Sequence, residues 1–235
     1  DQMNEGERLQ EIFGKFTEYV GENPFTHQFN KDIHESQQAV FQPAKQLVIS
    51  VDFNLNPFGV IFSHVYRDAS GMHFHTFDEA EIENGSMNKM IQLINERYKN
   101  NLHNCIITGD AMGKSRSLMT NDASSYFEQL RRGLNLRESQ IQVTSNPTHE
   151  NSRSDCNYVL FQSKKSNSPI EVLINPRTAT GLCRDLKSVQ CDAFGKILKR
   201  NRNILNQRAD LLDCWRYIVN AVLKKWIIEN QKLNK

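Results

Sequence analysis

Short apolar runs rich in β-branched residues mark the predicted strands in the middle of the chain. The first run spans residues 47–51. Two more runs, at 59–66 and 72–77, follow across short turn-like segments, which is typical of an antiparallel meander. A fourth run, at 104–108, comes after a predicted helix at 86–99. A strand that is reached through a helix is a candidate for parallel pairing with the first strand.

Predicted helices and strands alternate through the rest of the chain. They are helices at 122–132, 152–164 and 180–188, and short strands at 141–143 and 170–174. The last predicted helix, at 206–229, carries a packing stripe made of Leu212, Trp215, Val219 and Val222. The whole pattern predicts an α/β fold with a central mixed β-sheet, in which an antiparallel meander and parallel strands are flanked by helices.

The N-terminal part of the chain has a different pattern. Apolar residues recur at helical spacing up to Asn23-Pro24, so residues 1–24 are predicted to form an amphipathic helix. Residues 25–45 are polar without a sustained period and are predicted to be a linker. We therefore divide the chain into an N-terminal helix and linker arm, 1–45, and one domain, 46–235. Because the first residue is Asp1 and not Met, we expect the chain to be a fragment or a processed product.

Composition narrows the class of protein only slightly. The chain has 235 residues, 38% of them hydrophobic, which excludes collagen-like and wholly disordered classes. No apolar run has the roughly 18 residues that a membrane span needs. The formal net charge is +2, well below the strong basicity of many DNA-reading domains. The five cysteines form no C-x-x-C pair, so neither a disulfide framework nor a zinc knuckle is expected.

Candidate chemistry lies in aspartates at strand ends. Asp52 ends the first predicted strand and Asp110 follows the fourth, so parallel pairing of these strands would place both carboxylates at one edge of the sheet. Asp210 and Asp213 share a face of the last helix. Clustered carboxylates are unfavourable unless a cation lies among them, and Mg²⁺ prefers such oxygen ligands. The alternative that these residues are turn or helix caps stays open at this point.

Residues 108–115 offer a competing interpretation. Gly113-Lys114-Ser115 follows a strand, as in a phosphate-binding loop, although the glycine that the motif requires is replaced by Thr108. A P-loop NTPase therefore remains an alternative to a metal-dependent enzyme.

Four segments, taken in order, resemble the C-terminal nuclease domain of tailed-bacteriophage terminase large subunits. They are Asn23-Pro24-Phe25, the run from Val48 to Asn54, the run from Ile106 to Ala111, and the run from Ala209 to Tyr217. The last one is the most specific, because it is similar to the acidic helix (His/Asp)-x-x-Asp-Ala-x-Arg-Tyr, with Cys214 in place of Ala. Residues 151–159 are also similar to a helix of that family, and the resemblance covers about residues 24–225.

The resemblance implies an RNase H-like fold and a metal-dependent endonuclease that cuts double-stranded concatemeric viral DNA during packaging. It assigns Asp52, Asp110 and Asp213 as catalytic residues that hold Mg²⁺ or Mn²⁺, two ions in all, with Asp210 in an auxiliary position. It also implies an ATPase domain, a portal and a small terminase subunit as partners, no membrane, and the cytoplasm of an infected or prophage-carrying bacterial host. A non-catalytic RNase H-like DNA-binding module is the remaining alternative.

Basic residues complete the candidate site. DNA phosphates are expected to contact a set of lysines and arginines, some in the loop after the fourth strand and most before the last helix: Lys114, Lys196, Lys199, Arg200, Arg202 and Arg208. Histidines 73, 75, 103 and 149 lack zinc-type spacing with cysteine partners, and we expect them at surface or strand positions instead.

Overall fold

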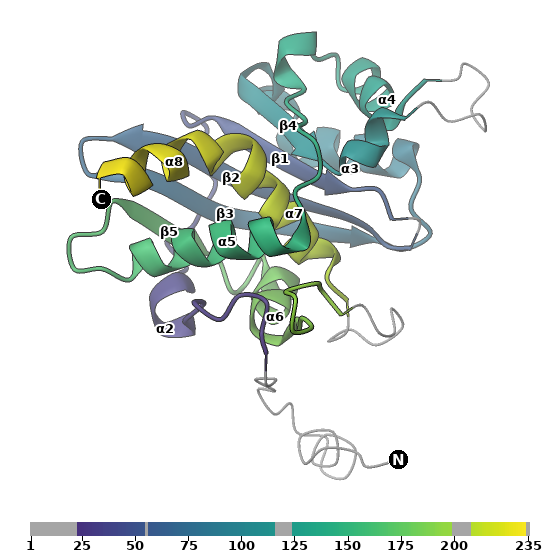
Figure 1. Ribbon diagram of the computed structural model, residues 1–235. Coiled ribbons are helices and arrows are strands. Elements are labelled where there is room, and N and C mark those ends of the chain that lie inside the picture. Colours follow the sequence, from purple (N-terminus) through teal and green to yellow (C-terminus); the bar gives the residue numbers. More distant parts are fainter. Residues whose placement is uncertain (1–22, 55, 116–123, 199–207, 234–235) are drawn as a thin grey trace, which may run out of the picture.

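A five-stranded mixed sheet forms the centre of the protein (Figure 1). The computed structural model describes residues 23–54, 56–115, 124–198 and 208–233. The strands lie in the order β4-β1-β2-β3-β5. Their bounds are β1 Leu47–Asp52, β2 Phe58–Asp68, β3 Gly71–Ile82, β4 Cys105–Gly109 and β5 Ile170–Ile174. Strands β1, β2 and β3 form the predicted antiparallel meander, and β4 pairs parallel to β1, also as predicted.

Helices cover both faces of this sheet (Figure 1). They are α2 Lys31–His34, α3 Met87–Tyr98, α4 Tyr126–Gly133, α5 His149–Ser163, α6 Thr180–Ser188, α7 Asp210–Ile218 and α8 Lys224–Leu233. The described residues also form short 3₁₀ turns, namely η1 Lys99–Asn104, η2 Ala111–Lys114 and η3 Glu138–Gln140. The predicted α/β class, with a mixed sheet flanked by helices, is confirmed.

Two apolar cores lie on opposite faces of the sheet. Because side chains alternate along a strand, Leu47 and Ile49 of β1 pack with α3 and α4, whereas Val48 packs with α5 to α8. All six residues of β1 are buried, as expected of a central strand that is covered on both faces. The five cysteines are free and buried. Trp215 of α7 is fully buried and stacks on Phe74 of β3.

The structure departs from the predicted elements in two places. The short strand predicted at 141–143 is wrong, because only Ile141 pairs with β4, through a single bridge to Ile107, before the chain leaves the sheet. The helix predicted at 206–229 is divided into α7, a π-helical segment η5 at Val219–Leu223, and α8. Its residues 206 and 207, like residues 122 and 123 of the helix predicted at 122–132, lie outside the described residues.

The segment predicted as a linker packs against the domain. Phe25 and Ala39 are fully buried, and Asn23 forms hydrogen bonds with the backbone near Cys191. The helix predicted at 1–24 falls almost entirely outside the described residues. The division of the chain into an arm, 1–45, and a domain, 46–235, remains a prediction. Among the described residues, no helix is both long enough and apolar enough to cross a bilayer.

Candidate metal centre at the end of the sheet

Parallel pairing places Asp52 and Asp110 at the same edge of the sheet. Val51 is in register with Gly109, and the Asp110 amide donates to the Val51 carbonyl oxygen at 3.0 Å. Gly109 has a φ of +148°, and a Cβ there would lie 2.1 Å from that oxygen. Only glycine permits so close an approach of the two strands, and this approach carries Asp110 to the end of β1.

Helix α7 brings two further aspartates to the same edge. Gly59 of β2 is paired with Asp52, and a Cβ at Gly59 would lie 3.3 Å from the Asp210 carbonyl oxygen, so the start of α7 rests on this pair. The Asn54 amide donates to the Asp52 carboxylate and, over 2.8 Å, to Asp210 Oδ1. Asp213 lies one helical turn further along α7. The exposed fractions of Asp52, Asp210 and Asp213 are only 3%, 1% and 2%.

These carboxylates act on the same neighbouring groups. Burial, and then the charges of Asp52, Asp213 and Asp210, raise the pKa of the Cys214 thiol well above its usual value. Burial also raises the pKa of Tyr217, followed by the charges of Asp213 and Asp52, with a smaller effect of Asp110. A single tyrosine is therefore within electrostatic reach of carboxylates from β1, α7 and the end of β4.

Hydrogen bonds orient two of the carboxylates. Arg216 Nε donates to Asp213 Oδ1 at 2.6 Å. Asp110 Oδ1 accepts from the Asn146 side-chain amide at 2.7 Å and from the Met112 backbone amide at 2.9 Å. Sequence reasoning assigned no role to Asn54, Asn146 or Arg216. Asn54 and Arg216 lie within two of the segments that resemble the terminase family. Nothing local in the sequence connects Asn146 with Asp110.

This donor set suits a hard divalent cation. Carboxylate oxygens are the ligands that Mg²⁺ and Mn²⁺ prefer, and buried like charges are unfavourable without a cation among them. A closer cluster lies elsewhere in the described residues: the ligand atoms of His73, His75 and Glu171 all lie within 4.8 Å of one another. The aspartates at the end of the sheet share one edge and have the donor chemistry for such an ion, although their oxygens lie farther apart than the ligand atoms of that cluster.

The residues predicted to contact DNA phosphates differ in exposure and in their bonding partners. Lys196 is exposed, whereas Lys114 Nζ donates to the Val143 carbonyl oxygen at 2.6 Å. Arg208 Nη1 lies 3.4 Å from Glu81 and 3.1 Å from Glu83, so acidic residues already balance its charge. The remaining three, Lys199, Arg200 and Arg202, lie outside the described residues. DNA contact by all six remains a prediction.

The loop after β4 does not have the geometry of a phosphate-binding loop. Asp110 caps the 3₁₀ turn η2, and Lys114 is the last residue of that turn. In a P-loop the lysine begins a helix and its ammonium faces the phosphates. Here the Lys114 ammonium is bound to a backbone carbonyl oxygen.

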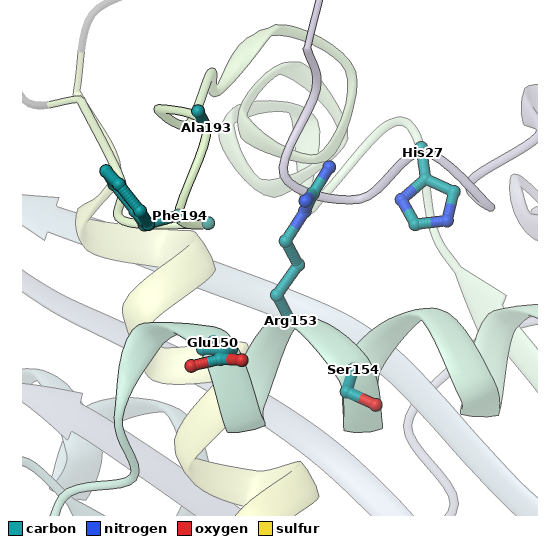
Figure 2. Close-up of a pocket in the computed structure, with 7 residues that line it drawn as sticks. His27, Glu150, Arg153, Ser154, Ala193 and Phe194 are labelled. Carbon is teal, nitrogen blue, oxygen red and sulfur yellow. The ribbon is translucent and has the colours of Figure 1, made fainter.

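A pocket lies apart from this centre, beside the first turns of α5 (Figure 2). Its volume is about 390 Å³, and its lining includes His27, Glu150 and the 85% exposed Phe194. Arg153 also lines the pocket, but its guanidinium donates to Asn23 Oδ1 at 2.8 Å. This arginine thus anchors the segment that precedes the domain.

Solved structures supply the comparison that the sequence alone does not. No protein-family model matches the chain, and no curated protein matches it either. The large terminase of a thermophilic bacteriophage, solved in complex with ATP-gamma-S, is similar with a TM-score of 0.61 and 16% identity. That match covers 93% of this chain and 52% of that one, so this chain spans about half the length of that terminase.

Two isolated nuclease domains match over most of their own length. The P22 large terminase nuclease domain is similar with a TM-score of 0.53 and 14% identity, over 85% of this chain and 92% of that one. The large terminase nuclease from the thermophilic phage G20c, solved with bound magnesium, gives a TM-score of 0.51 and 13% identity, over 83% and 97%. The chain therefore has the RNase H-like fold of the nuclease domain of bacteriophage large terminases.

Proposed function

We propose that this chain is a divalent-metal-dependent endonuclease that cleaves double-stranded concatemeric viral DNA during genome packaging. The observation that carries the proposal is the meeting of Asp52, Asp110 and the two aspartates of α7 at one edge of the sheet. The fold supports it, since the similar P22 and G20c domains are named as large terminase nucleases.

Asp52, Asp110 and Asp213 are the proposed ligands of two Mg²⁺ or Mn²⁺ ions, with Asp210 as an auxiliary ligand. The G20c nuclease was solved with magnesium, in keeping with this choice. Bound there, such ions supply Lewis-acid assistance to phosphodiester hydrolysis.

The chain's own polar residues orient these carboxylates. Asn54 donates to both Asp52 and Asp210, which holds the end of β1 and the start of α7 at a fixed separation. Arg216 fixes Asp213, and Asn146 fixes Asp110. Orientation of this kind increases reactivity because the ligands need not reorganise when the substrate binds.

The partners follow from the proposed role. Double-stranded DNA is the substrate, and Lys196 is an exposed candidate for phosphate contact. The similar terminase that was solved with ATP-gamma-S is about twice as long as the region that matches this chain. We therefore propose that this nuclease acts beside an ATPase domain, with a portal and a small terminase subunit, in the cytoplasm of the bacterial host.

Cleavage of supercoiled plasmid tests the proposal. We expect nicking and linearisation with Mn²⁺ or Mg²⁺, no cleavage with EDTA, and loss of cleavage in Asp52→Asn. Asparagine keeps the size of the side chain and an oxygen that can accept from Asn54, so the circular dichroism spectrum should not change. Asp32→Asn, on the exposed first turn of α2, is the matched control and should cleave normally.

Two outcomes contradict the proposal. The first is undiminished cleavage by Asp52→Asn. The second is retention of DNA by the wild-type chain without cleavage under any metal, which would indicate a non-catalytic binding module. Adding ATP tests the P-loop alternative. A P-loop enzyme would gain thermal stability when it binds the nucleotide, and it would lose that gain in Lys114→Ala.

A further inference from the structure

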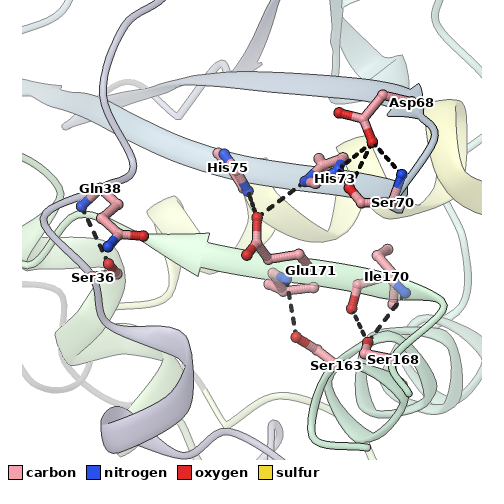
Figure 3. A network of polar contacts seen from close by, with 11 residues as sticks. Ser36, Gln38, Asp68, Ser70, His73, His75, Ser163, Ser168, Ile170 and Glu171 are labelled. Carbon is pink, nitrogen blue, oxygen red and sulfur yellow. Dashed lines mark hydrogen bonds and ion pairs between the residues drawn. The ribbon is translucent and has the colours of Figure 1, made fainter. Parts of the chain in front are cut away.

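We propose that His73, His75 and Glu171 form a second metal site, selective for a borderline transition ion such as Zn²⁺. The three side chains lie at the β3–β5 side of the sheet (Figure 3). His75 is paired across the meander with His64, five residues along β2 from Gly59, the partner of Asp52. At about 3.4 Å per residue, the two sites are separated by roughly 17 Å along the strand direction alone, so the proposal is independent of the nuclease assignment.

The backbone brings the three ligands together without any loop. His73 and His75 are two residues apart on β3 and point to the same face of the sheet. Glu171 is the register partner of His73 on the parallel strand β5. Its Oε2 lies 3.0 Å from His73 Nδ1 and 2.7 Å from His75 Nε2, and all three ligand atoms lie within 4.8 Å of one another.

Both ring nitrogens of His73 lie next to carboxylate oxygens. Its Nε2 lies 3.0 Å from Asp68 Oδ1 and 2.9 Å from Ser70 Oγ, and the same Asp68 oxygen accepts from the Ser70 backbone amide (Figure 3). Ionised carboxylates only accept, and a neutral imidazole has a single N–H. If Nε2 donates to Asp68, the lone pair on Nδ1 faces a lone pair of Glu171. An ion bound to both atoms removes this conflict.

Asp68 also has the position of an outer ligand partner. Metal-binding histidines commonly donate their second ring nitrogen to a carboxylate, which fixes the tautomer and the ring orientation. The Tyr66 ring stacks on His73 with 4.5 Å between centroids and restrains the imidazole further. His75 lacks such a partner, because its buried Nδ1 has no hydrogen-bond acceptor among the described residues. That deficit should weaken binding by roughly tenfold or more relative to a fully satisfied site.

Solvent can reach the site. Glu171 alternates with the buried Ile170 and Val172, so its side chain lies on the opposite face of β5 and is 49% exposed. Two imidazoles and a carboxylate are ligands that suit Zn²⁺, Co²⁺ or Ni²⁺, and they leave a position open to water. The acidic centre, by contrast, offers only oxygens. We therefore expect hard ions such as Mg²⁺ to bind at the acidic centre and borderline ions such as Zn²⁺ to bind at the second site. An ion bound at the second site would link the edge strand β5 to β3.

Zn²⁺ titration by calorimetry tests the proposal, with millimolar Mg²⁺ present and Asp52→Asn as the background so that the acidic centre does not contribute. We expect one Zn²⁺ per chain and a rise in melting temperature. Glu171→Gln and His73→Gln should each weaken binding by at least about tenfold, and Asp68→Asn by roughly tenfold. Glu229→Gln on α8 and His103→Gln in η1, both exposed, are matched controls that should leave affinity unchanged.

Two results overturn the proposal. One is the absence of Zn²⁺ binding to folded wild-type protein, which would mean that a second proton on His73 satisfies Glu171 instead. The other is equal Zn²⁺ affinity with and without Glu171→Gln in the Asp52→Asn background. Because Glu171 is exposed, the Gln variant should fold, and its circular dichroism spectrum checks this.

Discussion

Asp185 supports the start of α7 from a neighbouring helix, and replacing it tests how the acidic centre is held. Asp185 lies on α6 and is fully buried. Its Oδ2 accepts from the Leu212 backbone amide at 3.3 Å, and its Oδ1 accepts from Arg184 at 2.8 Å. Ala209 at the N-cap of α7 provides no side-chain bond, so Asp185 satisfies one of the free amides of the first turn.

The expected loss of stability follows from these contacts. Asp185→Ala leaves the buried Leu212 amide without this acceptor, at a cost of about 1–3 kcal/mol. Arg184 loses its nearer partner but keeps Glu81 at 3.8 Å and is 24% exposed, so the full penalty of about 3–5 kcal/mol for breaking a buried pair does not apply. We expect a total of about 3 kcal/mol for Asp185→Ala. Asp185→Asn keeps an acceptor oxygen and should cost about 1 kcal/mol.

The pH dependence distinguishes this carboxyl from an ordinary ion pair. Burial raises the pKa of Asp185 from 3.8 to about 7, although Arg184 opposes the shift. The folded state thus holds the proton more tightly than the unfolded state. The stability that Asp185 contributes over the Asn variant is full below about pH 4 and is lost as the pH rises through 7, by at most about 1.4 kcal/mol per pH unit.

Urea unfolding between pH 5 and 8 measures both effects, with the fluorescence of the buried Trp215 as the signal. The advantage of wild type over Asp185→Asn in unfolding free energy should fall as the pH rises from 5 to 7 and should change little from pH 7 to 8. A difference that widens over this range would show a stabilising ionised pair and refute the reasoning. An unfolding free energy of Asp185→Ala within about 0.5 kcal/mol of the wild-type value would also refute the reasoning, because surface substitutions cause changes of that size.

Three further substitutions address the acidic edge directly. Gly109→Ala forces a Cβ to within 2.1 Å of a backbone oxygen at a positive φ, so it should cost more than about 3 kcal/mol in thermal or urea unfolding. Arg216→Met leaves the buried Asp213 without its 2.6 Å partner and should cost about 3 kcal/mol by the same measurement. Asn54→Ala removes the amide that two carboxylates share; plasmid cleavage should fall severalfold while stability changes by about 1 kcal/mol. Unchanged unfolding or cleavage in any of these variants contradicts the role given to that residue.

Local patterns predicted the part of the fold that local physics determines. The apolar run at 47–51 was recognisable because a strand buried on both faces has no polar position to interrupt it. The helix between the third and fourth strands implied parallel pairing of β1 with β4, which is confirmed. That pairing in turn predicted the shared edge of Asp52 and Asp110.

Other features depend on pairing across the chain, which no local pattern records. Arg208 looked like a phosphate ligand within a basic run, yet Glu81 of β3 and Glu83, which follows that strand, lie against it. His73 and His75 occupy a strand, as expected, but their spacing gave no sign of Glu171 nearly a hundred residues later. Only Ile141 of the run at 141–143 bridges to the open side of β4, so the run did not become a strand.

The stretch before β1 also protects the sheet from other chains. The Ser36 amide donates to the Ile174 carbonyl oxygen at 2.9 Å, and Glu35 bridges to Ile174, so this stretch occupies part of the outer side of β5. A chain shortened to begin at residue 46 would expose that hydrogen-bonding edge. It would also expose the part of the apolar core that Phe25 covers. Exposed edges of this kind recruit strands from neighbouring molecules. The shortest stable form of this domain should therefore begin no later than Asn23, although the strand pattern starts only at Leu47.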